Sequence, residues 1–127
     1  MLFRSSIDVF LSTATGGGWE LTVTEAMACK KPVVIPKHTS FEHLGGQNAE
    51  RAYYLETLYP IVAMIDNIIR FQCDLYEISE VLHQVYLDKT SDAVDQKLKI
   101  EKAYNFVESL DWKGIAKTFS DEIKKMT

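Results

Sequence analysis

The sequence predicts an α/β fold with a small, mostly parallel sheet flanked by helices and a helical C-terminal third. Two short runs rich in apolar and β-branched residues, 7–12 and 33–35, enclose a glycine-rich loop and a helix-forming segment, which is the pattern of a strand–helix–strand unit. From Leu75 onward, apolar side chains instead recur every three or four residues, the spacing of amphipathic helices. A length of 127 residues fits one domain over residues 1–127.

Local signals place each element of the first half. Residues 7–12 form a buried strand that runs into three consecutive glycines, and helix formers fill the second half of 21–29. Residues 33–35, closed by Pro36, form the second strand. We further expect a short helix at 41–44, a third strand at 52–55, and an irregular insertion with one or two short strands over 58–71.

The C-terminal third should form three helices, each with one apolar stripe. The first stripe consists of Leu75, Ile78, Leu82 and Val85. In the second helix, within 92–110, the residues expected to face inward are Val94, Leu98, Phe106 and Val107. Asp111 is typical of a helix N-cap, and the stripe of the helix that follows consists of Trp112, Ile115, Phe119 and Ile123.

Composition and charge exclude several classes of protein. Apolar residues make up 46% and charged residues 25% of the chain, a globular balance that argues against disorder and fibrous repeats. The net charge of −4 gives no basic surface for non-specific nucleic-acid binding. No segment is suited to be a transmembrane helix, and the pair Lys124-Lys125 is too small a cluster to attract a membrane by itself. We therefore expect a soluble, cytoplasmic protein.

The most informative segment is GGGWELTVTEAMACKKPVV, residues 16–34. A glycine-rich turn between a strand and a helix lets the backbone approach a ligand closely, and the helix N-terminus behind it offers unpaired N–H groups to a phosphate. Glu25, one turn into that helix, can accept two hydrogen bonds from the hydroxyls of a ribose. The segment matches neither the P-loop nor the dinucleotide-binding fingerprint, so a nucleotide-phosphate site and a purely structural tight turn both remain open.

Residues 7–34, IDVFLSTATGGGWELTVTEAMACKKPVV, resemble part of the C-terminal, donor-binding domain of the retaining GT-B glycosyltransferases of group 1 (family 4). Members of that family typically read aDvfv-PS-x-x-EGFGL-x-x-x-EAMA-x-G-x-PVV. The resemblance continues more weakly at Glu42 and at the Leu110-Asp111-Trp112 start of the last helix. It implies an incomplete Rossmann-like domain that binds a nucleotide-diphosphate sugar, whose glycosyl group is transferred to an acceptor. It implies no cofactor and no metal ion, since GT-B enzymes generally hold the diphosphate with protein cations and amides.

The resemblance implies roles for individual positions. Glu25 corresponds to the second glutamate of the family's E-x7-E motif, which holds the ribose of the donor; the alternative is a solvated helix glutamate. The residues that correspond to the diphosphate and sugar loop are Gly17, Gly18, Trp19, Glu20, Leu21 and Thr22. For Thr22, the alternative is a hydroxyl that caps the helix locally. In retaining members the donor phosphate itself is thought to help guide the acceptor, so this domain is expected to supply no catalytic residue.

Three positions depart from the family pattern. Gly17 replaces the first glutamate of the motif, which contacts the transferred sugar, and Glu20 and Lys30 stand where the family has glycine. Loss of a charged hydrogen bond worth about 1.5–3 kcal/mol would weaken donor binding or turnover roughly ten- to a hundred-fold. The family's acceptor domain, and the strands whose Arg and Lys neutralise the diphosphate, are also missing. Transfer would therefore need a missing N-terminal domain or a partner chain, and the isolated chain is expected to be inactive.

A non-catalytic role is the alternative. The missing cations, the missing acceptor domain and Gly17 also fit a glycosyltransferase-like module or fragment that acts in interaction or regulation. The open edge of a small sheet predicts a homodimer or an aggregation-prone chain. His38, Glu42 and His43 are spaced one residue too far apart for an inverted zincin motif, and we interpret the histidines as surface or loop-capping residues instead of metal ligands.

Overall fold

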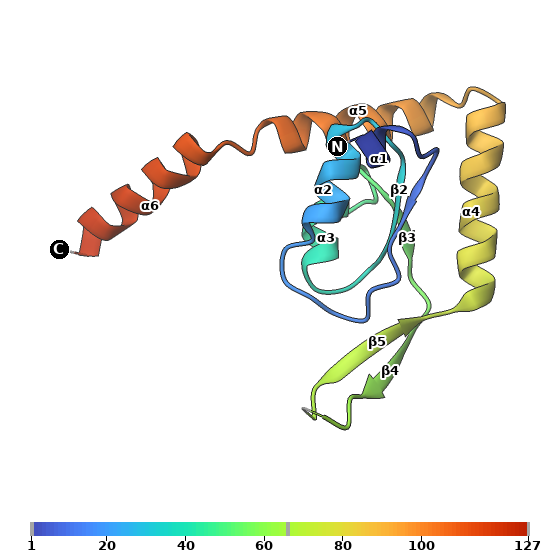
Figure 1. Cartoon of the computed structure of the whole chain (residues 1–127), viewed down its shortest axis with the longest axis horizontal. Helices are drawn as coiled ribbons and strands as arrows, with labels where there is room; N and C mark the ends of the chain where they lie inside the picture. The colour runs from blue at the N-terminus through green and yellow to red at the C-terminus, as the bar shows by residue number, and fades with distance from the viewer. Residues whose placement is uncertain (1, 66, 127) are drawn as a thin grey trace.

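A parallel three-stranded sheet lies at the centre of the computed structural model, which describes residues 2–65 and 67–126 (Figure 1). Its strands lie side by side in chain order and are β1 (Phe10–Leu11), β2 (Val33–Pro36) and β3 (Tyr53–Leu55). The predicted α/β class and the third strand are confirmed, although β1 is shorter than the predicted strand at 7–12.

Helices connect the parallel strands. α2 (Leu21–Ala28) joins β1 to β2, α3 (Ser40–Gly45) joins β2 to β3, and the short α1 (Leu2–Ser5) precedes β1. After α2, Lys30 adopts the left-handed conformation with φ 54°. A lysine in this conformation costs about 1 kcal/mol relative to glycine, the residue that the glycosyltransferase pattern has at this position.

Helices cover both faces of the sheet. On one face, Val33 and Ile35 of β2 pack in a buried cluster with residues of α2, α3 and α5 (Val94–Glu108). On the other face, Val34 packs in a second cluster with residues of α4 (Leu75–Thr90). Alternate residues of β2 therefore contact opposite helical layers, and every residue of β2 is buried, as expected for the central strand of a parallel sheet.

The inward face of α5 differs from the prediction. Phe106 packs against the core as expected, but Val94 and Leu98 are 70% and 49% exposed, so their inward orientation was wrongly predicted. The buried face runs through Gln96 and Ala103 instead. Residues two positions apart in an α-helix point in directions that differ by about 200° around the helix axis. Burial of Gln96 therefore turns Leu98 to the opposite side of the helix.

The last helix stands apart from the sheet. α6 (Trp112–Met126) begins where predicted, and Oδ1 of Asp111 accepts a hydrogen bond of 2.8 Å from the backbone N–H of Gly114, which confirms the N-cap. α6 buries none of its described residues and extends away from the other elements (Figure 1). Among the described residues, no helix combines the length and apolar character needed to cross a membrane.

The segment between β3 and α4 is a regular antiparallel hairpin. Its strands are β4 (Leu58–Val62) and β5 (Ile69–Cys73), and it projects from the body of the chain on a different side from α6 (Figure 1). The prediction of one or two short strands in this segment is confirmed, but the pairing of the two strands was not foreseen. The hairpin also reaches back to the glycine-rich loop described next.

Candidate functional site

The glycine-rich loop between β1 and α2 is held in place by two segments that are distant in sequence. The carbonyl oxygen of Ala14 lies 3.1 Å from Nε2 of His38, which follows β2. The carbonyl oxygen of Thr15 accepts a hydrogen bond of 2.9 Å from the backbone N–H of Phe71 on β5. These contacts fix the start of the loop and leave the glycines at 16–18 exposed.

Nothing in the backbone of the loop requires glycine at 16–18. None of these three residues has a positive φ, and a methyl group added at Gly16 or Gly18 would meet no atom within 4 Å. A methyl group added at Gly17 would lie 2.5 Å from Oε1 of Glu20, so the Glu20 carboxylate lies against this glycine. The loop therefore gives no support to the interpretation as a tight structural turn, and its backbone is open to solvent.

The first turn of α2 carries backbone N–H groups without a partner. In the described part of the chain, the N–H groups of Val23 and Thr24 donate to the Glu20 carbonyl at 3.1 and 3.3 Å, whereas those of Leu21 and Thr22 meet no acceptor. The hydroxyl of Thr22 makes no described hydrogen bond either, so local capping by Thr22 is not observed. Two exposed N–H groups at the positive end of the helix dipole can therefore bind an anion.

Glu25 pairs with a cation from the first helix of the chain. Its Oε2 lies 2.8 Å from Nη2 of Arg4, and the Nε–H of Arg4 donates to the carbonyl oxygen of Thr22 at 3.3 Å. The side chain of Glu25 is 46% exposed and that of Arg4 is 21% exposed. Glu25 is therefore open to solvent on one side and neutralised on the other, and Arg4 brings positive charge beside the first turns of α2.

His38 is a buried loop-capping residue. It is 4% exposed, and because a carbonyl oxygen only accepts, Nε2–H donates to Ala14 while Nδ1 lies 3.1 Å from the Thr39 hydroxyl. Burial lowers the pKa of His38 below its usual value, with a smaller opposing contribution from the hydrogen bond to Ala14. The loop-capping interpretation is confirmed for His38. Glu42 and His43 lie exposed on α3, and among the described residues no three His, Cys, Asp or Glu side chains gather to hold a metal ion.

An apolar groove of about 490 Å³ lies beside the N-terminus of α2. Trp19, Leu21 and Thr24 line one part of it, and His43 contributes from α3, its ring centroid 5.9 Å from that of Trp19. The remaining lining residues come from the end of α5 and the start of α6 and are Val107, Leu110, Trp112 and Ile115. Two of the predicted loop residues therefore sit at the edge of a hydrophobic surface.

The predicted site residues form one continuous path. Residues 17–22 run from the open loop into the first turn of α2, and Glu25 follows one turn later. This path is also contacted from other elements by Arg4 and Phe71, which were not predicted as site residues. The one signal for Arg4 was its charge, opposite to that of Glu25, and a charge alone does not identify its partner.

No protein-family model matches this chain, and neither a curated protein nor a solved structure is significantly similar to it.

Proposed function

We propose that this chain is the donor-binding part of a glycosyltransferase and binds a nucleotide-diphosphate sugar. The observation that carries the proposal is the path from the exposed glycines at 16–18, through the free N–H groups of Leu21 and Thr22, to the half-exposed carboxylate of Glu25. Parallel strands flank α2 in sequence, an arrangement like the Rossmann-like unit in which phosphates bind at the helix N-terminus. The pattern of residues 7–34 supports the same assignment.

Each part of the path has a role in glycosyl transfer. The N–H groups of Leu21 and Thr22 would stabilise the negative charge that develops on the diphosphate as the glycosidic bond to it breaks. Glu25 would accept hydrogen bonds from the ribose and so position the nucleotide. A carboxylate has two oxygens with about four acceptor sites, so Glu25 can hold the ribose while it keeps its ion pair with Arg4.

Glu20 would act as the carboxylate that the position of Gly17 lacks. Its Oε1 lies against Gly17. At this position the glycosyltransferase family that residues 7–34 resemble has a glutamate that contacts the transferred sugar. A carboxylate at this helix N-terminus repels a free diphosphate but can accept hydrogen bonds from sugar hydroxyls. We therefore expect Glu20→Gln to strengthen binding of a nucleoside diphosphate. The affinity for the nucleotide sugar should fall relative to the affinity for the nucleoside diphosphate.

A partner would complete the enzyme. In this proposal the acceptor site lies on a second domain, a partner chain or a second copy, and transfer takes place in the cytoplasm. The alternative function is a non-catalytic interaction module of glycosyltransferase-like fold. The observation that favours it is the large apolar surface left exposed on two elements. Trp112 on α6 is 84% exposed, and Met64 on the β4–β5 hairpin is 95% exposed.

Isothermal titration calorimetry with the diphosphates of uridine, guanosine and adenosine, and with their sugar conjugates, tests the donor-binding proposal. One nucleotide should bind, and Glu25→Gln should lower the affinity for it about ten- to a hundred-fold, because the substitution removes charged hydrogen bonds worth about 1.5–3 kcal/mol. Glu56→Gln is the matched control because Glu56 is also an exposed carboxylate in an ion pair, 2.7 Å from Nζ of Lys37.

Thermal unfolding of the same variant distinguishes loss of binding from loss of folding. The partly exposed pair of Glu25 and Arg4 should contribute about 0–1 kcal/mol to stability, so Glu25→Gln should melt within a few degrees of the wild type. Absence of binding to the folded wild-type chain at millimolar nucleotide would overturn the donor-site assignment and leave the interaction module as the remaining function.

A further inference from the structure

The C-terminal helix α6 presents an apolar stripe that the rest of the described chain leaves largely exposed, although Trp112 and Ile115 at its start also line the groove beside α2. Trp112, Ile115, Phe119 and Ile123 recur every three or four residues and are 84%, 51%, 69% and 47% exposed. The helix buries none of its described residues, and it extends away from the sheet and its helices (Figure 1). An amphipathic helix with one fully formed apolar face is therefore open to a second surface.

The polar side of α6 carries an excess of positive charge. The helix contains four lysines and two carboxylates, a net charge of +2, whereas the whole chain has a net charge of −4. Lys124 and Lys125 pair with Asp121 at 4.0 Å and Glu122 at 2.6 Å. In the described part of the chain, Lys113 and Lys117 lie within ion-pair distance of no carboxylate. α6 is therefore a cationic element on an acidic protein.

We propose that α6 docks in the plane of an anionic lipid bilayer, with its apolar stripe among the acyl chains and its lysines at the headgroups. Aromatic and aliphatic residues on one face and lysines on the other are the composition of helices that lie in a membrane interface. The pair Lys124-Lys125 is too small a cluster by itself, but the structure joins it to Lys113, Lys117 and a continuous apolar stripe on one helix.

The position of α6 also limits repulsion between the acidic body and an anionic surface. A helix of 15 residues is about 22 Å long, at 1.5 Å per residue. Electrostatic interactions at physiological ionic strength fall off over about 8 Å. Because α6 extends away from the sheet, its C-terminal part is separated from most of the acidic body, and the local charge of the helix dominates the encounter with a surface (Figure 1).

A second copy of the chain fits α6 less well than a membrane. In a two-fold antiparallel pair of helices centred between Thr118 and Phe119, each flank of the stripe meets the same flank of the partner. Lys113 and Lys124 share one flank, so Lys113 of each copy would face the partner's Lys124. Such like charges oppose association, whereas the same lysines are attracted to an anionic bilayer.

Vesicle co-sedimentation with the full chain tests the proposal. Vesicles of phosphatidylcholine with roughly a third of phosphatidylglycerol should bind the chain, and pure phosphatidylcholine should bind it at least ten-fold less. The double variant Lys113→Gln/Lys117→Gln should bind about five-fold less per lysine removed, since each lysine near the surface contributes about 1 kcal/mol. Lys97→Gln/Lys102→Gln, on exposed positions of α5, is the matched control and should bind like the wild type.

The apolar stripe has its own pair of variants. Phe119→Ser should reduce binding at least ten-fold, because the buried phenyl group supplies much of the apolar area. Tyr76→Ser, at an aromatic residue of α4 that is 84% exposed, should leave binding unchanged. Both variants should keep the circular dichroism and melting temperature of the wild type, since neither residue is buried.

Three results would overturn the proposal. The first is no sedimentation with anionic vesicles, and the second is equal binding to neutral and anionic vesicles. The third is a stable dimer that Phe119→Ser dissociates and that does not bind vesicles, which would assign the stripe to a second copy. The proposal does not depend on nucleotide binding, so a failed calorimetric experiment leaves it standing.

Discussion

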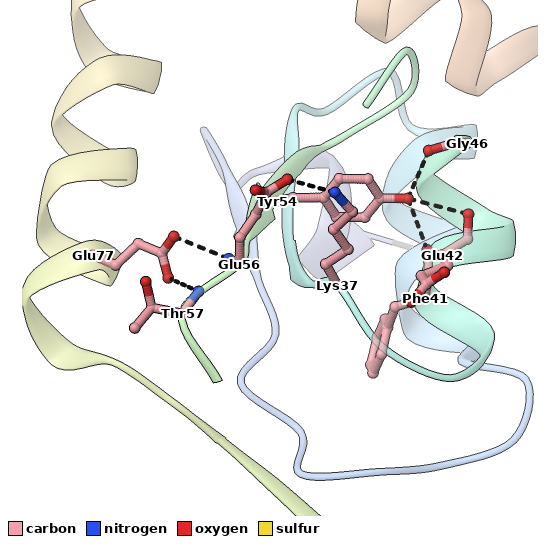
Figure 2. Close-up of polar contacts among 8 residues, drawn as sticks. All are labelled: Lys37, Phe41, Glu42, Gly46, Tyr54, Glu56, Thr57 and Glu77. Atoms are coloured by element: carbon pink, nitrogen blue, oxygen red, sulfur yellow. Dashed lines mark hydrogen bonds and ion pairs between the residues drawn. The ribbon is translucent and has the colours of Figure 1, made fainter. Parts of the chain in front are cut away.

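The buried hydroxyl of Tyr54 secures the end of α3, and Tyr54→Phe removes it with little change in shape. Figure 2 shows the phenol of Tyr54 reaching from β3 to the C-terminal end of α3. Its oxygen lies 2.8 Å from the carbonyl oxygen of Gly46, 3.1 Å from that of Glu42 and 3.4 Å from that of Phe41. A hydroxyl has one proton to donate, so Gly46, at the shortest distance, is its main acceptor.

The expected cost follows from burial. Tyr54 is 8% exposed, so the carbonyl that loses its donor is not compensated by bulk water. Leaving a buried acceptor unsatisfied costs about 1–3 kcal/mol, and we expect Tyr54→Phe to lower the free energy of unfolding by that amount. At about 2.1 cal/mol/K of unfolding entropy per residue, a chain of 127 residues loses roughly 4 °C of Tm per kcal/mol, so Tm should fall by about 4–12 °C.

Urea titration and calorimetry of Tyr54→Phe and of a control variant measure the loss in free energy of unfolding. Tyr59→Phe is the control, because the Tyr59 hydroxyl also donates a hydrogen bond, 3.1 Å from Oδ2 of Asp74, but its side chain is 53% exposed. It should change stability by less than about 0.5 kcal/mol, as surface substitutions usually do. Equal and small losses in the two variants would refute the reasoning that burial makes the Tyr54 hydrogen bond valuable.

The same hydroxyl predicts how stability depends on alkaline pH. Burial, helped by the nearby Glu42 carboxylate, raises the pKa of Tyr54 from 10.0 to about 12. A folded-state pKa above the unfolded one gives stability that is complete below pH 10.0 and is lost as pH rises toward 12. The Tyr54→Phe variant should therefore lose less stability than the wild type between these pH values, and parallel pH profiles would contradict the assignment.

Three further outcomes are expected. Burial holds the pKa of His38 below 6.5, so urea stability should fall as pH drops below 6.5, and His38→Gln, which can still donate to Ala14, should flatten that fall; an unchanged profile would refute the role of His38. Asp74→Ala removes the N-cap of α4, where Oδ1 accepts from the backbone N–H of Glu77 at 2.9 Å, and should cost about 1 kcal/mol in urea titration, whereas no loss would show that the cap is dispensable. Deletion of residues 112–127 should change the Tm of the remaining chain by less than about 2 °C, since α6 buries none of its described residues; a larger drop in calorimetry would place α6 in the folding core.

The sequence by itself determined most of the local structure. Val33, Val34 and Ile35 are β-branched residues between two prolines, which predicted the central strand, and Asp111 predicted the start of the last helix. These predictions succeeded because β-branching, proline and a short carboxylate act on the backbone of their own segment. For the same reason the loop at 16–18 and the helix that carries Glu25 could be placed from sequence alone.

The tertiary structure alone decided which segments support the candidate site and which side chains are buried. Arg4 pairs with Glu25, and the backbone N–H of Phe71 on the hairpin donates to the carbonyl of Thr15, although no feature of the sequence identifies either pair of partners. Leu98 is exposed although it lies in an apolar pattern, because the packing of α5 turned a different face to the core. Contacts of this kind depend on the relative placement of whole elements. A periodic pattern shows that a helix has an apolar face, but the neighbours that cover that face are set by the fold.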